Sequence, residues 1–536
     1  MTGGEVVVRT LAAHGVEHVF GIPGTHNLEL YRHLGAHGIA HVTPRHEQGA
    51  GYAADGYARV SARPGVCLVT AGPALMNVLV AATTAYADSI PMLVVSPGLP
   101  RGLEGRDSGF LHELKDASGG VGRLLAWSRR VESAEEAGET IAEAFAGFRT
   151  ERPRPVHVEV PLDVLEGATD PFAAAIRPAA VVAPDPDAIE QAADLLARAR
   201  GAASIVVGGG ARGAAAEVLR MAERLGAPVL STTNGKAVLD ENHPLAVGVA
   251  LRSPRAWQHL HGERVVLAIG TELADTDLAG QRAEFGGTLL RIDVDRAQLH
   301  RNAVADLPLL GDAAAVLRRL EASLDERGVR AGAEGADGHR DGVACAAALR
   351  AALDQGSAAI GAPWAPICEA LTDVLEPDAI VAGDSARVCY MGLTRPLWRR
   401  VPSSYLYPTG ASTLGYGLPA AIGAKVARPD RQVVAVMGDG GLMFTLPELA
   451  TAVELKLPLP LVVATDGGYG QIRGQMIERG IAPVGVDLLA PDFATVARGL
   501  GARGETLDGA DNLPDALARA LAADGPTLID MRMEDR

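Results

Sequence analysis

Two aspartates flanked by glycines carry the most recognisable chemistry in this sequence. Asp439 lies in the turn GDGG after the apolar run RQVVAVM, and Asp466 follows PLPLVVAT, 27 residues further along the chain. That interval suits one strand–helix–strand unit, so both carboxylates can reach one edge of a parallel sheet. Carboxylate oxygens beside glycine N–H groups and a helix N-terminus suit Mg²⁺ together with a diphosphate. Either turn alone is better explained as an ordinary Asp-Gly turn, and the paired placement favours the metal site.

The residues between the two aspartates are expected to form a helix. Thr445 and Glu448 have the spacing of a capping box, and Pro447 is compatible with a first helical turn. The pattern predicts a helix that begins there and continues through ELATAVELKL.

The elements that would position these residues are short apolar strands alternating with longer helical patterns. Unbroken Val/Ile/Leu runs recur along the chain, among them GVCLVTAG, PMLVVSPG, ASIVVGGG, RVVLAIG and DAIVAGD. Such runs predict strands buried on both faces, and their alternation with helices predicts parallel sheets. We therefore expect an α/β fold with three doubly wound parallel-sheet domains.

Two stretches have the composition of linkers. Residues 165–187 are rich in Pro, Ala and Asp, and residues 323–358 carry Gly and charge where core residues would be expected. Because 536 residues exceed what one core supports, we predict domains at residues 1–170, 187–323 and 358–536.

The composition disfavours several classes of protein. With 49 basic and 65 acidic residues the net charge is −16, and the basic residues are scattered, which disfavours nucleic-acid binding. No apolar segment is long enough to span a bilayer, and MTGGEVVVRTLAAHG lacks the apolar core of a signal peptide. The four cysteines share no metal-ligand spacing and are expected to be reduced. We expect a cytoplasmic protein without nucleic-acid or membrane partners.

The GDG turn, with Asp466 and further glycines about one unit later, resembles the cofactor motif of thiamine-diphosphate enzymes. Those enzymes typically have Asn-Asn where this chain has Thr465-Asp466. The resemblance implies that Asp439, Asp466 and the backbone carbonyl of Gly468 bind Mg²⁺. Asp in place of Asn keeps an oxygen ligand and adds a negative charge. The resemblance also implies cofactor contacts for Gly438, Gly440, Gly441 and Tyr469.

The resemblance is to the superfamily of acetolactate synthase, pyruvate decarboxylase and benzoylformate decarboxylase, and it covers essentially the whole chain. Its domain order is pyrimidine-binding, middle and diphosphate-binding. The segment TPRHEQGAGYAADGYARV resembles the one that carries the glutamate facing the aminopyrimidine ring, which would be Glu47. That carboxyl group shares a proton with the ring and so helps to generate the C2 ylide. The alternative is that Glu47 is a surface residue near Arg45.

Two further segments match cofactor-binding regions of the family. In PTGASTLGYGLPAAIGA, Leu414 would lie under the bend of the cofactor, and the Ser412 carbonyl would accept from its 4′-amino group. The alternative, a glycine-rich turn into a helix, is compatible with this role. In VAGDSARVCYMG, Asp384 and Ser385 would lie near the diphosphate.

Three segments are expected to line the substrate pocket. In GIPGTHNLELYRHL, Thr25 and His26 would face C2, and in GYGQIRGQM, Gln471 could reach the substrate. In SGFLHELKDASGG, the residues at the family's variable pocket positions would be Phe110, His112 and Glu113. His26 and His112 are candidates for proton transfer, and the alternative for each is a hydrogen bond to backbone only.

The resemblance implies that the ylide adds to the carbonyl of a 2-oxo acid, that CO₂ leaves, and that an enamine remains. The segments GIPGTHNLELYR, GFLHELKD and GIAPVGVDLLAPDFATVARGLGA look more like a 5-guanidino-2-oxopentanoate decarboxylase branch than like acetolactate synthase. We therefore predict a 2-oxo acid decarboxylase. The first alternative is an acetolactate synthase-like carboligase, in which the enamine attacks a second carbonyl. The second is a non-catalytic subunit that binds thiamine diphosphate.

The family also bears on the middle domain and on assembly. Acetolactate synthases bind FAD in this domain, but the single glycine-rich turn in IVVGGGARG is weak support, and FAD is not expected. The resemblance implies a homodimer or homotetramer with active sites at subunit interfaces, where Glu47 and Asp439 of one site come from different subunits.

Overall fold

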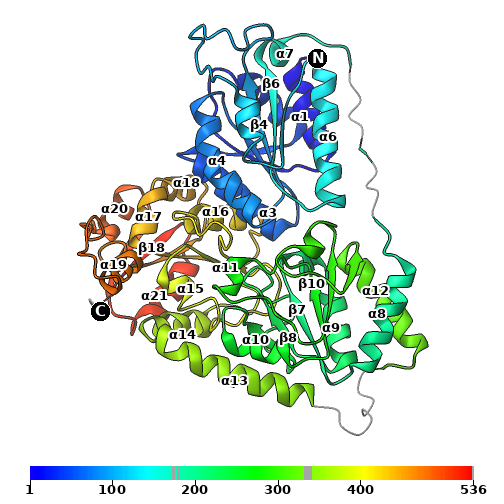
Figure 1. The fold of residues 1–536 in the computed structure, drawn as a ribbon. Helices are drawn as coiled ribbons and strands as arrows, with labels where there is room; N and C mark the ends of the chain where they lie inside the picture. Colours follow the sequence, from blue (N-terminus) through cyan, green and yellow to red (C-terminus); the bar gives the residue numbers. More distant parts are fainter. Residues whose placement is uncertain (172–175, 178–181, 331–340, 534–536) are drawn as a thin grey trace.

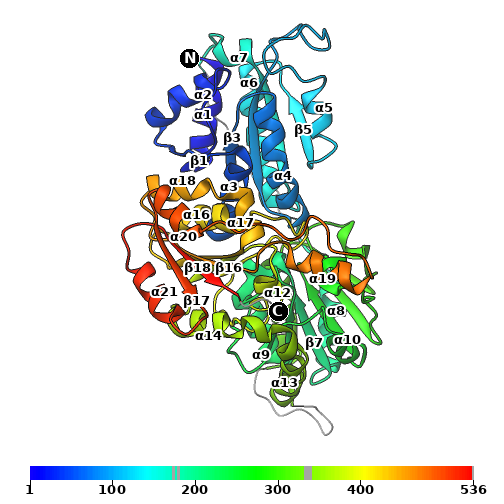
Figure 2. The same cartoon turned by 90° about the vertical axis from the view of Figure 1, so that its left-hand side faces the viewer.

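The computed structural model of the protein describes residues 1–171, 176–177, 182–330 and 341–533. Three six-stranded sheets follow one another along the chain, and every strand pair within them is parallel. Each sheet is flanked by helices, as Figures 1 and 2 show. The predicted α/β class with three doubly wound parallel-sheet domains is confirmed.

The N-terminal sheet has the strand order β2-β1-β3-β4-β6-β5. Its strands are β1 (His18–Phe20), β2 (Ala40–Val42), β3 (Gly65–Leu68), β4 (Met92–Gly98), β5 (Trp127–Arg130) and β6 (Val156–Pro161). The helices of this part are α1 (Gly3–Ala13), α2 (Leu28–Leu34), α3 (Glu47–Ser61), α4 (Pro73–Ala87), α5 (Ala117–Val121), α6 (Ala134–Thr150) and α7 (Leu162–Glu166).

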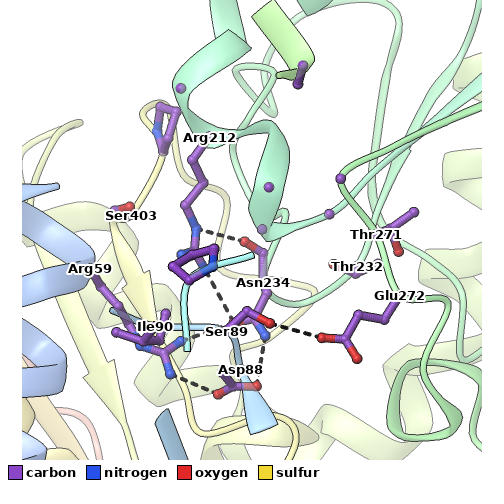
Figure 3. Close-up of a pocket in the computed structure, with 18 of the residues that line it drawn as sticks. Arg59, Asp88, Ser89, Ile90, Arg212, Thr232, Asn234, Thr271, Glu272 and Ser403 are labelled. Atoms are coloured by element: carbon purple, nitrogen blue, oxygen red, sulfur yellow. Dashed lines mark hydrogen bonds and ion pairs between the residues drawn. The ribbon is translucent and has the colours of Figure 1, made fainter. Parts of the chain in front are cut away.

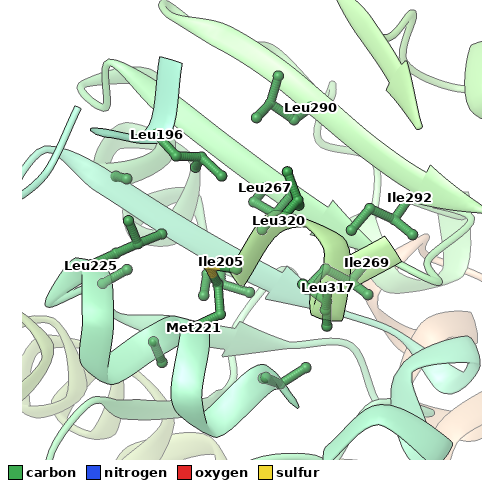
Figure 4. Packing of buried hydrophobic residues seen from close by; sticks show 14 of the residues in the cluster. Leu196, Ile205, Met221, Leu225, Leu267, Ile269, Leu290, Ile292, Leu317 and Leu320 are labelled. Carbon is green, nitrogen blue, oxygen red and sulfur yellow. The ribbon is translucent and has the colours of Figure 1, made fainter. Parts of the chain in front are cut away.

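The middle sheet has the order β12-β11-β10-β7-β8-β9. Its strands are β7 (Ala203–Val207), β8 (Val229–Ser231), β9 (Ala246–Val249), β10 (Val265–Ile269), β11 (Thr288–Asp293) and β12 (Leu307–Leu310). Its helices are α8 (Pro186–Arg198), α9 (Ala215–Leu225), α10 (Pro254–His261), α11 (Asp275–Leu278), α12 (Ala313–Glu326) and α13 (Gly342–Gly361). Figure 4 shows Ile205, Leu267 and Leu290 of its strands packed against α8, α9 and α12.

The C-terminal sheet has the order β14-β13-β15-β16-β18-β17. Its strands are β13 (Ile380–Gly383), β14 (Tyr405–Leu406), β15 (Val433–Gly438), β16 (Pro460–Thr465), β17 (Arg503–Asp508) and β18 (Thr527–Arg532). Its helices are α14 (Ala365–Val374), α15 (Arg387–Tyr390), α16 (Gly417–Ala427), α17 (Asp439–Thr445), α18 (Glu448–Glu454), α19 (Gly470–Glu478), α20 (Phe493–Gly499) and α21 (Leu513–Leu521).

Both expected linkers lie partly outside the described residues. The first, 165–187, includes residues 172–175 and 178–181, and the second, 323–358, includes residues 331–340. Much of the second is helical, because α13 begins at Gly342 and buries Ala346, Leu349 and Leu353 against the middle domain. The linker interpretation was wrong there: the Ala-rich sequence supplies a narrow apolar face that propensity alone does not reveal. The domain boundaries remain a prediction.

The predicted helix start at Thr445 was also wrong. Helix α17 begins at Asp439 and ends at Thr445, whose hydroxyl donates to the Gly415 carbonyl at 2.8 Å, and α18 begins at Glu448. The Glu448 carboxylate accepts from the backbone N–H groups of Arg45 and His46 instead, each at 3.0 Å. The capping-box pattern failed because both side chains have partners distant in the sequence.

The N-terminal and C-terminal domains meet where α3 crosses α16, near the centre of Figure 1. The helices approach closely because glycines lie at the crossing. A Cβ on Gly56 would come within 2.1 Å of the Ala420 carbonyl oxygen, and one on Gly423 within 1.8 Å of the Ala53 carbonyl oxygen. This crossing fixes the N-terminus of α3, and therefore Glu47, relative to the C-terminal domain of the same chain.

Candidate active site

The two aspartates lie at one edge of the C-terminal sheet, as their spacing predicted. Asp439 directly follows β15 and Asp466 directly follows β16, and these strands are neighbours with Gly438 opposite Ala464. Asp439 Oδ2 accepts from the Gly467 N–H at 3.0 Å. Burial, and secondly the charge of Asp466, raise the pKa of Asp439. Two acidic groups that disfavour each other's charge in this way form a site that a cation would stabilise.

The glycines around these aspartates are required by close contacts. A Cβ on Gly441 would lie 2.4 Å from Asp384 Oδ2, and one on Gly468 would lie 2.0 Å from the Val486 carbonyl oxygen. Gly468 also has a φ of +149°, which L side chains rarely adopt. The floor of the site is therefore bare backbone, which suits the close approach of an anionic group.

Most of the predicted cofactor and metal residues line one cavity of about 780 Å³. That volume suits a cofactor-sized molecule. The predicted residues that line it are Ser385, Ser412, Leu414, Gly438, Asp439, Gly440, Gly441, Asp466, Gly468, Tyr469 and Gln471. Oxygen ligands, bare glycine backbone and the apolar Leu414 side chain together fit a metal-bound diphosphate joined to an aromatic cofactor.

Asp384 lies beneath this cavity rather than in its lining. It is fully buried, and its carboxylate accepts from the N–H groups of Ser385 at 2.7 Å, Gly415 at 3.0 Å and Tyr416 at 3.3 Å. Burial raises its pKa to about 6 despite these bonds. Asp384 thus positions the loop that carries Ser412 and Leu414, and Ser385 is the member of the predicted pair that faces the cavity.

Glu47 is the first residue of α3 and does not line the cavity of its own chain. Its carboxylate accepts from Asn77 Nδ2 at 2.9 Å. The preceding residues, Arg45 and His46, are held by the buried Glu448 of the C-terminal domain. Glu47 is therefore oriented by two elements, which is more than a solvated surface glutamate would need.

Three of the predicted substrate residues of the N-terminal domain, His26, Phe110 and His112, line a smaller cavity of about 290 Å³. His26 is buried, stacks on Phe110 at 5.9 Å between ring centroids, and meets the edge of His112 at 5.1 Å. Burial, and secondly His112, lower the pKa of His26, which favours a neutral imidazole. Glu113 points back into its own loop, where it accepts from the Phe110 N–H at 2.9 Å. Thr25 does not line this cavity.

One residue of the main cavity was missed by sequence reasoning. Arg387, the first residue of α15, forms an ion pair with Asp466 at 2.6 Å between Nη2 and Oδ2. Three residues later, the Tyr390 hydroxyl donates to Gln471 Oε1 at 2.9 Å. Arg387 lies in the segment VAGDSARVCYMG, and its closeness in sequence to the candidate Asp384 was the available signal.

A third cavity, of about 630 Å³, lies where the three domains meet, beside the glycine-rich turn of the middle domain (Figure 3). A buried polar network borders it. Arg59 donates to Asp88 at 2.8 Å and to Asn234 at 3.0 Å, and Asn234 donates to Asp88 at 2.9 Å. Asp88 also accepts from the Gly410 N–H at 2.9 Å, so the network joins all three domains.

The described residues also limit what the site can be. They contain no group of three or more His, Cys, Asp or Glu side chains that could hold a metal ion, so any cation here depends on two carboxylates and backbone oxygen. In the same part of the chain, every helix is too short or too polar to cross a membrane.

Comparisons with known proteins agree with this geometry. Three family models match: the thiamine pyrophosphate enzyme N-terminal TPP binding domain at residues 1–119, the central domain at 189–320, and the C-terminal TPP binding domain at 388–531. The probable 2-ketoarginine decarboxylase AruI of Pseudomonas aeruginosa is 41% identical over 535 residues, which cover 99% of this chain and 94% of that protein. The probable acetolactate synthase large subunit of Methanocaldococcus jannaschii is 32% identical, covering 99% of this chain and 92% of that protein. The acetolactate synthase of Mycobacterium bovis is also 32% identical, covering 99% and 88%.

The resemblance drawn from the motifs, including the guanidino-oxopentanoate (2-ketoarginine) branch, is confirmed by these matches. The chain carries the thiamine-pyrophosphate domains in the predicted order, and its relatives are a 2-oxo acid decarboxylase and acetolactate synthases. By identity over nearly its full length and by the site at the end of β15 and β16, the chain belongs to the thiamine pyrophosphate enzymes.

Proposed function

We propose that this enzyme decarboxylates a 2-oxo acid with thiamine diphosphate and Mg²⁺, and that its substrate carries a basic or polar side chain as 2-ketoarginine does. The single observation that supports the proposal best is the position of Asp439 and Asp466. They lie at the carboxyl ends of two neighbouring strands, beside glycine backbone without side chains. The 41% identity to a probable 2-ketoarginine decarboxylase supports the substrate class.

Different residues of the chain would bind the metal ion, the diphosphate and the rest of the cofactor. Asp439, Asp466 and the Gly468 carbonyl would hold Mg²⁺, and the backbone of Gly438, Gly440 and Gly441 would receive the diphosphate. Leu414, Ser412 and Tyr469 line the same cavity and would orient the remainder of the cofactor. When bound, the cofactor supplies a thiazolium that accepts the electron pair left by CO₂.

Three residues would transfer protons during the reaction. Glu47 would exchange a proton with the aminopyrimidine ring, and Asn77 orients its carboxylate. His26 and His112 would transfer protons at the reacting carbon, since a histidine can act in either form near neutral pH. Gln471, fixed by Tyr390, would bind the substrate. Thr25 remains a candidate for the same pocket.

We also propose a homodimer or homotetramer in which Glu47 of one subunit meets the cofactor bound by its partner. Glu47 lies outside the cavity of its own chain, so a complete site needs a second copy. Apolar side chains beside the site support this: Met76 and Val80 on α4, and Met443 and Phe444 on α17, are exposed in the single chain. A subunit interface would cover these exposed apolar side chains on both helices.

The test is CO₂ release with Mg²⁺ and thiamine diphosphate across 2-ketoarginine, pyruvate, 2-oxobutyrate, phenylpyruvate and benzoylformate, with products identified by mass. The proposal expects one aldehyde per CO₂, and fastest turnover with 2-ketoarginine. A longer hydroxy ketone as product would instead establish an acetolactate synthase-like carboligase. Cofactor binding without CO₂ from any substrate would favour the non-catalytic alternative.

Glu47→Gln is the matched variant, because it keeps the shape and removes the exchangeable carboxyl proton. Turnover should fall by at least a hundredfold, within the usual range for general acid–base groups. Glu143→Gln, in the same domain but in the lining of none of the three cavities, is the control. Unchanged turnover in Glu47→Gln would refute the role of Glu47.

A further inference from the structure

Arg387 and Asp466 form an ion pair inside the cofactor cavity, and neither the motifs nor the comparisons give it a role. Nη2 of Arg387 lies 2.6 Å from Oδ2 of Asp466, and both side chains are only about a quarter exposed, at 28%. Within the described residues, Oδ1 of Asp466 accepts no hydrogen bond from the chain. The Arg387 guanidinium therefore occupies Oδ2 of this carboxylate, and Oδ1 is available to a metal ion.

The surroundings of the pair are built to hold it. The Arg387 guanidinium lies over the Trp364 ring, 5.5 Å from its centroid. Gly470 leaves the necessary space, because a Cβ there would lie 2.4 Å from both Arg387 Nη2 and Asp466 Oδ2. The Tyr390–Gln471 hydrogen bond joins the same two segments one helical turn further along. Helix α15 thus contacts Asp466, directly after β16, and Gln471, in α19.

The charges of the site suggest why Arg387 lies beside Asp466. Two carboxylates already neutralise one divalent cation, so a bound diphosphate would add negative charge that the ligands do not offset. Relatives with Asn at the position of Asp466 would not carry the second carboxylate. Arg387 supplies a positive charge beside the Asp466 carboxylate. Its guanidinium binds Oδ2 and leaves Oδ1 uncovered.

We propose that Arg387 is a positioning residue for the metal site: it neutralises Asp466 and turns Oδ1 toward the cation, so that an aspartate works where an asparagine would otherwise serve. The inference rests on the proposed function in that it assumes Mg²⁺ and a diphosphate as the ligands. Its test measures binding alone and needs no substrate.

The test is a double-mutant cycle on Mg²⁺ affinity, measured by titration calorimetry with Mg²⁺ at saturating thiamine diphosphate. R387M should weaken Mg²⁺ binding by at least tenfold, because Asp466 loses the partner that orients Oδ1 toward the cation. In the D466N background, which keeps the ligand oxygen and removes the charge, the same change should weaken binding by less than threefold. Non-additivity of this size is the signature of a pair that acts together.

The alternative is that Arg387 only supports the fold of α15. In that case R387M would weaken Mg²⁺ binding equally in both backgrounds, and this outcome, or no effect in either, would overturn the proposal. R387Q provides a second neutral side chain and must show the same pattern, which keeps the test decisive should R387M fold poorly. R503M removes an Arg–Asp pair at 2.7 Å elsewhere in the same domain and should leave Mg²⁺ affinity within twofold.

The failures of the two proposals can be told apart. An enzyme that binds Mg²⁺ and thiamine diphosphate with the predicted non-additivity, but releases no CO₂ from any 2-oxo acid, would refute the proposed function and leave the role of Arg387 standing. An active decarboxylase whose Mg²⁺ affinity is unchanged by R387M would support the proposed function and refute the role of Arg387.

Discussion

Replacement of Glu448 by alanine should loosen the catalytic end of α3 without touching the cofactor cavity. Glu448 is 1% exposed, and its carboxylate accepts from the N–H groups of Arg45 and His46, directly before Glu47. It does not line the cavity, so its truncation acts only through the position of α3.

The carboxylate also accepts from the Thr451 hydroxyl at 2.8 Å, but only its bonds to the Arg45 and His46 N–H groups hold α3, and the magnitude follows from these two. Hydrogen bonds to a charged acceptor contribute about 1.5–3 kcal/mol each. Arg45 and His46 are themselves exposed, so water can reach their N–H groups once the carboxylate is gone, and we take about 3 kcal/mol for both together. At about 1.4 kcal/mol per factor of ten, local opening at these residues should become roughly a hundredfold more frequent.

Hydrogen exchange measures this opening directly, because protected amides exchange through local unfolding. Peptides covering residues 44–50 should exchange about a hundredfold faster in Glu448→Ala, and turnover should fall as Glu47 loses its fixed position. The control is Glu454→Ala, which removes only the exposed ion pair to the Arg45 guanidinium and should change exchange by less than about fivefold. Equal protection in the two variants would refute the idea that Glu448 holds the end of α3.

Three further outcomes are expected. Gly441→Ala should weaken thiamine diphosphate binding by at least tenfold in calorimetry, because its Cβ would lie 2.4 Å from an Asp384 oxygen and push the cavity floor outward; wild-type affinity would contradict this. Arg59→Met should lower the melting temperature strongly, since it leaves two buried aspartates unpaired at a cost of about 3–5 kcal/mol, and a shift below 2 °C would show that the domains do not depend on this network. His157 is buried with its pKa lowered to about 3, so the unfolded chain takes up the proton first and stability is lost as pH falls from about 6.5. At pH 5 this costs roughly 2 kcal/mol, and His157→Gln should flatten the decline of the melting temperature between pH 7 and 5.

Features that depend on neighbouring residues were predictable from the sequence. Unbroken apolar runs located strands such as β15 and β16, and parallel pairing then required that Asp439 and Asp466 meet at one edge. The glycines beside them were visible in the sequence as the turn GDGG, and the structure shows that close contacts leave no space for a side chain at Gly441 and Gly468.

Features that depend on distant partners were not predictable in the same way. Glu448 has the local pattern of a cap, but the backbone N–H groups that it binds lie about four hundred residues earlier in the chain. Arg387 finds Asp466 at a separation of 79 residues, which no periodicity encodes. The sequence predicted Asp384 on a strand-end loop near the cofactor, but only packing determines that its carboxylate turns inward to the amides of Gly415 and Tyr416.

The contact between Glu448 and the N–H of His46 spans 402 residues, which has a consequence for biosynthesis. At about 5–20 residues per second, a ribosome needs roughly 20–80 s to advance from one partner to the other. The N-terminal domain therefore emerges and folds long before the carboxylate that holds the start of α3 exists. Throughout this interval a nascent chain carries Glu47 on a helix end that has Asn77 as a partner but lacks Glu448, so catalytic competence is acquired only after the last domain has been made.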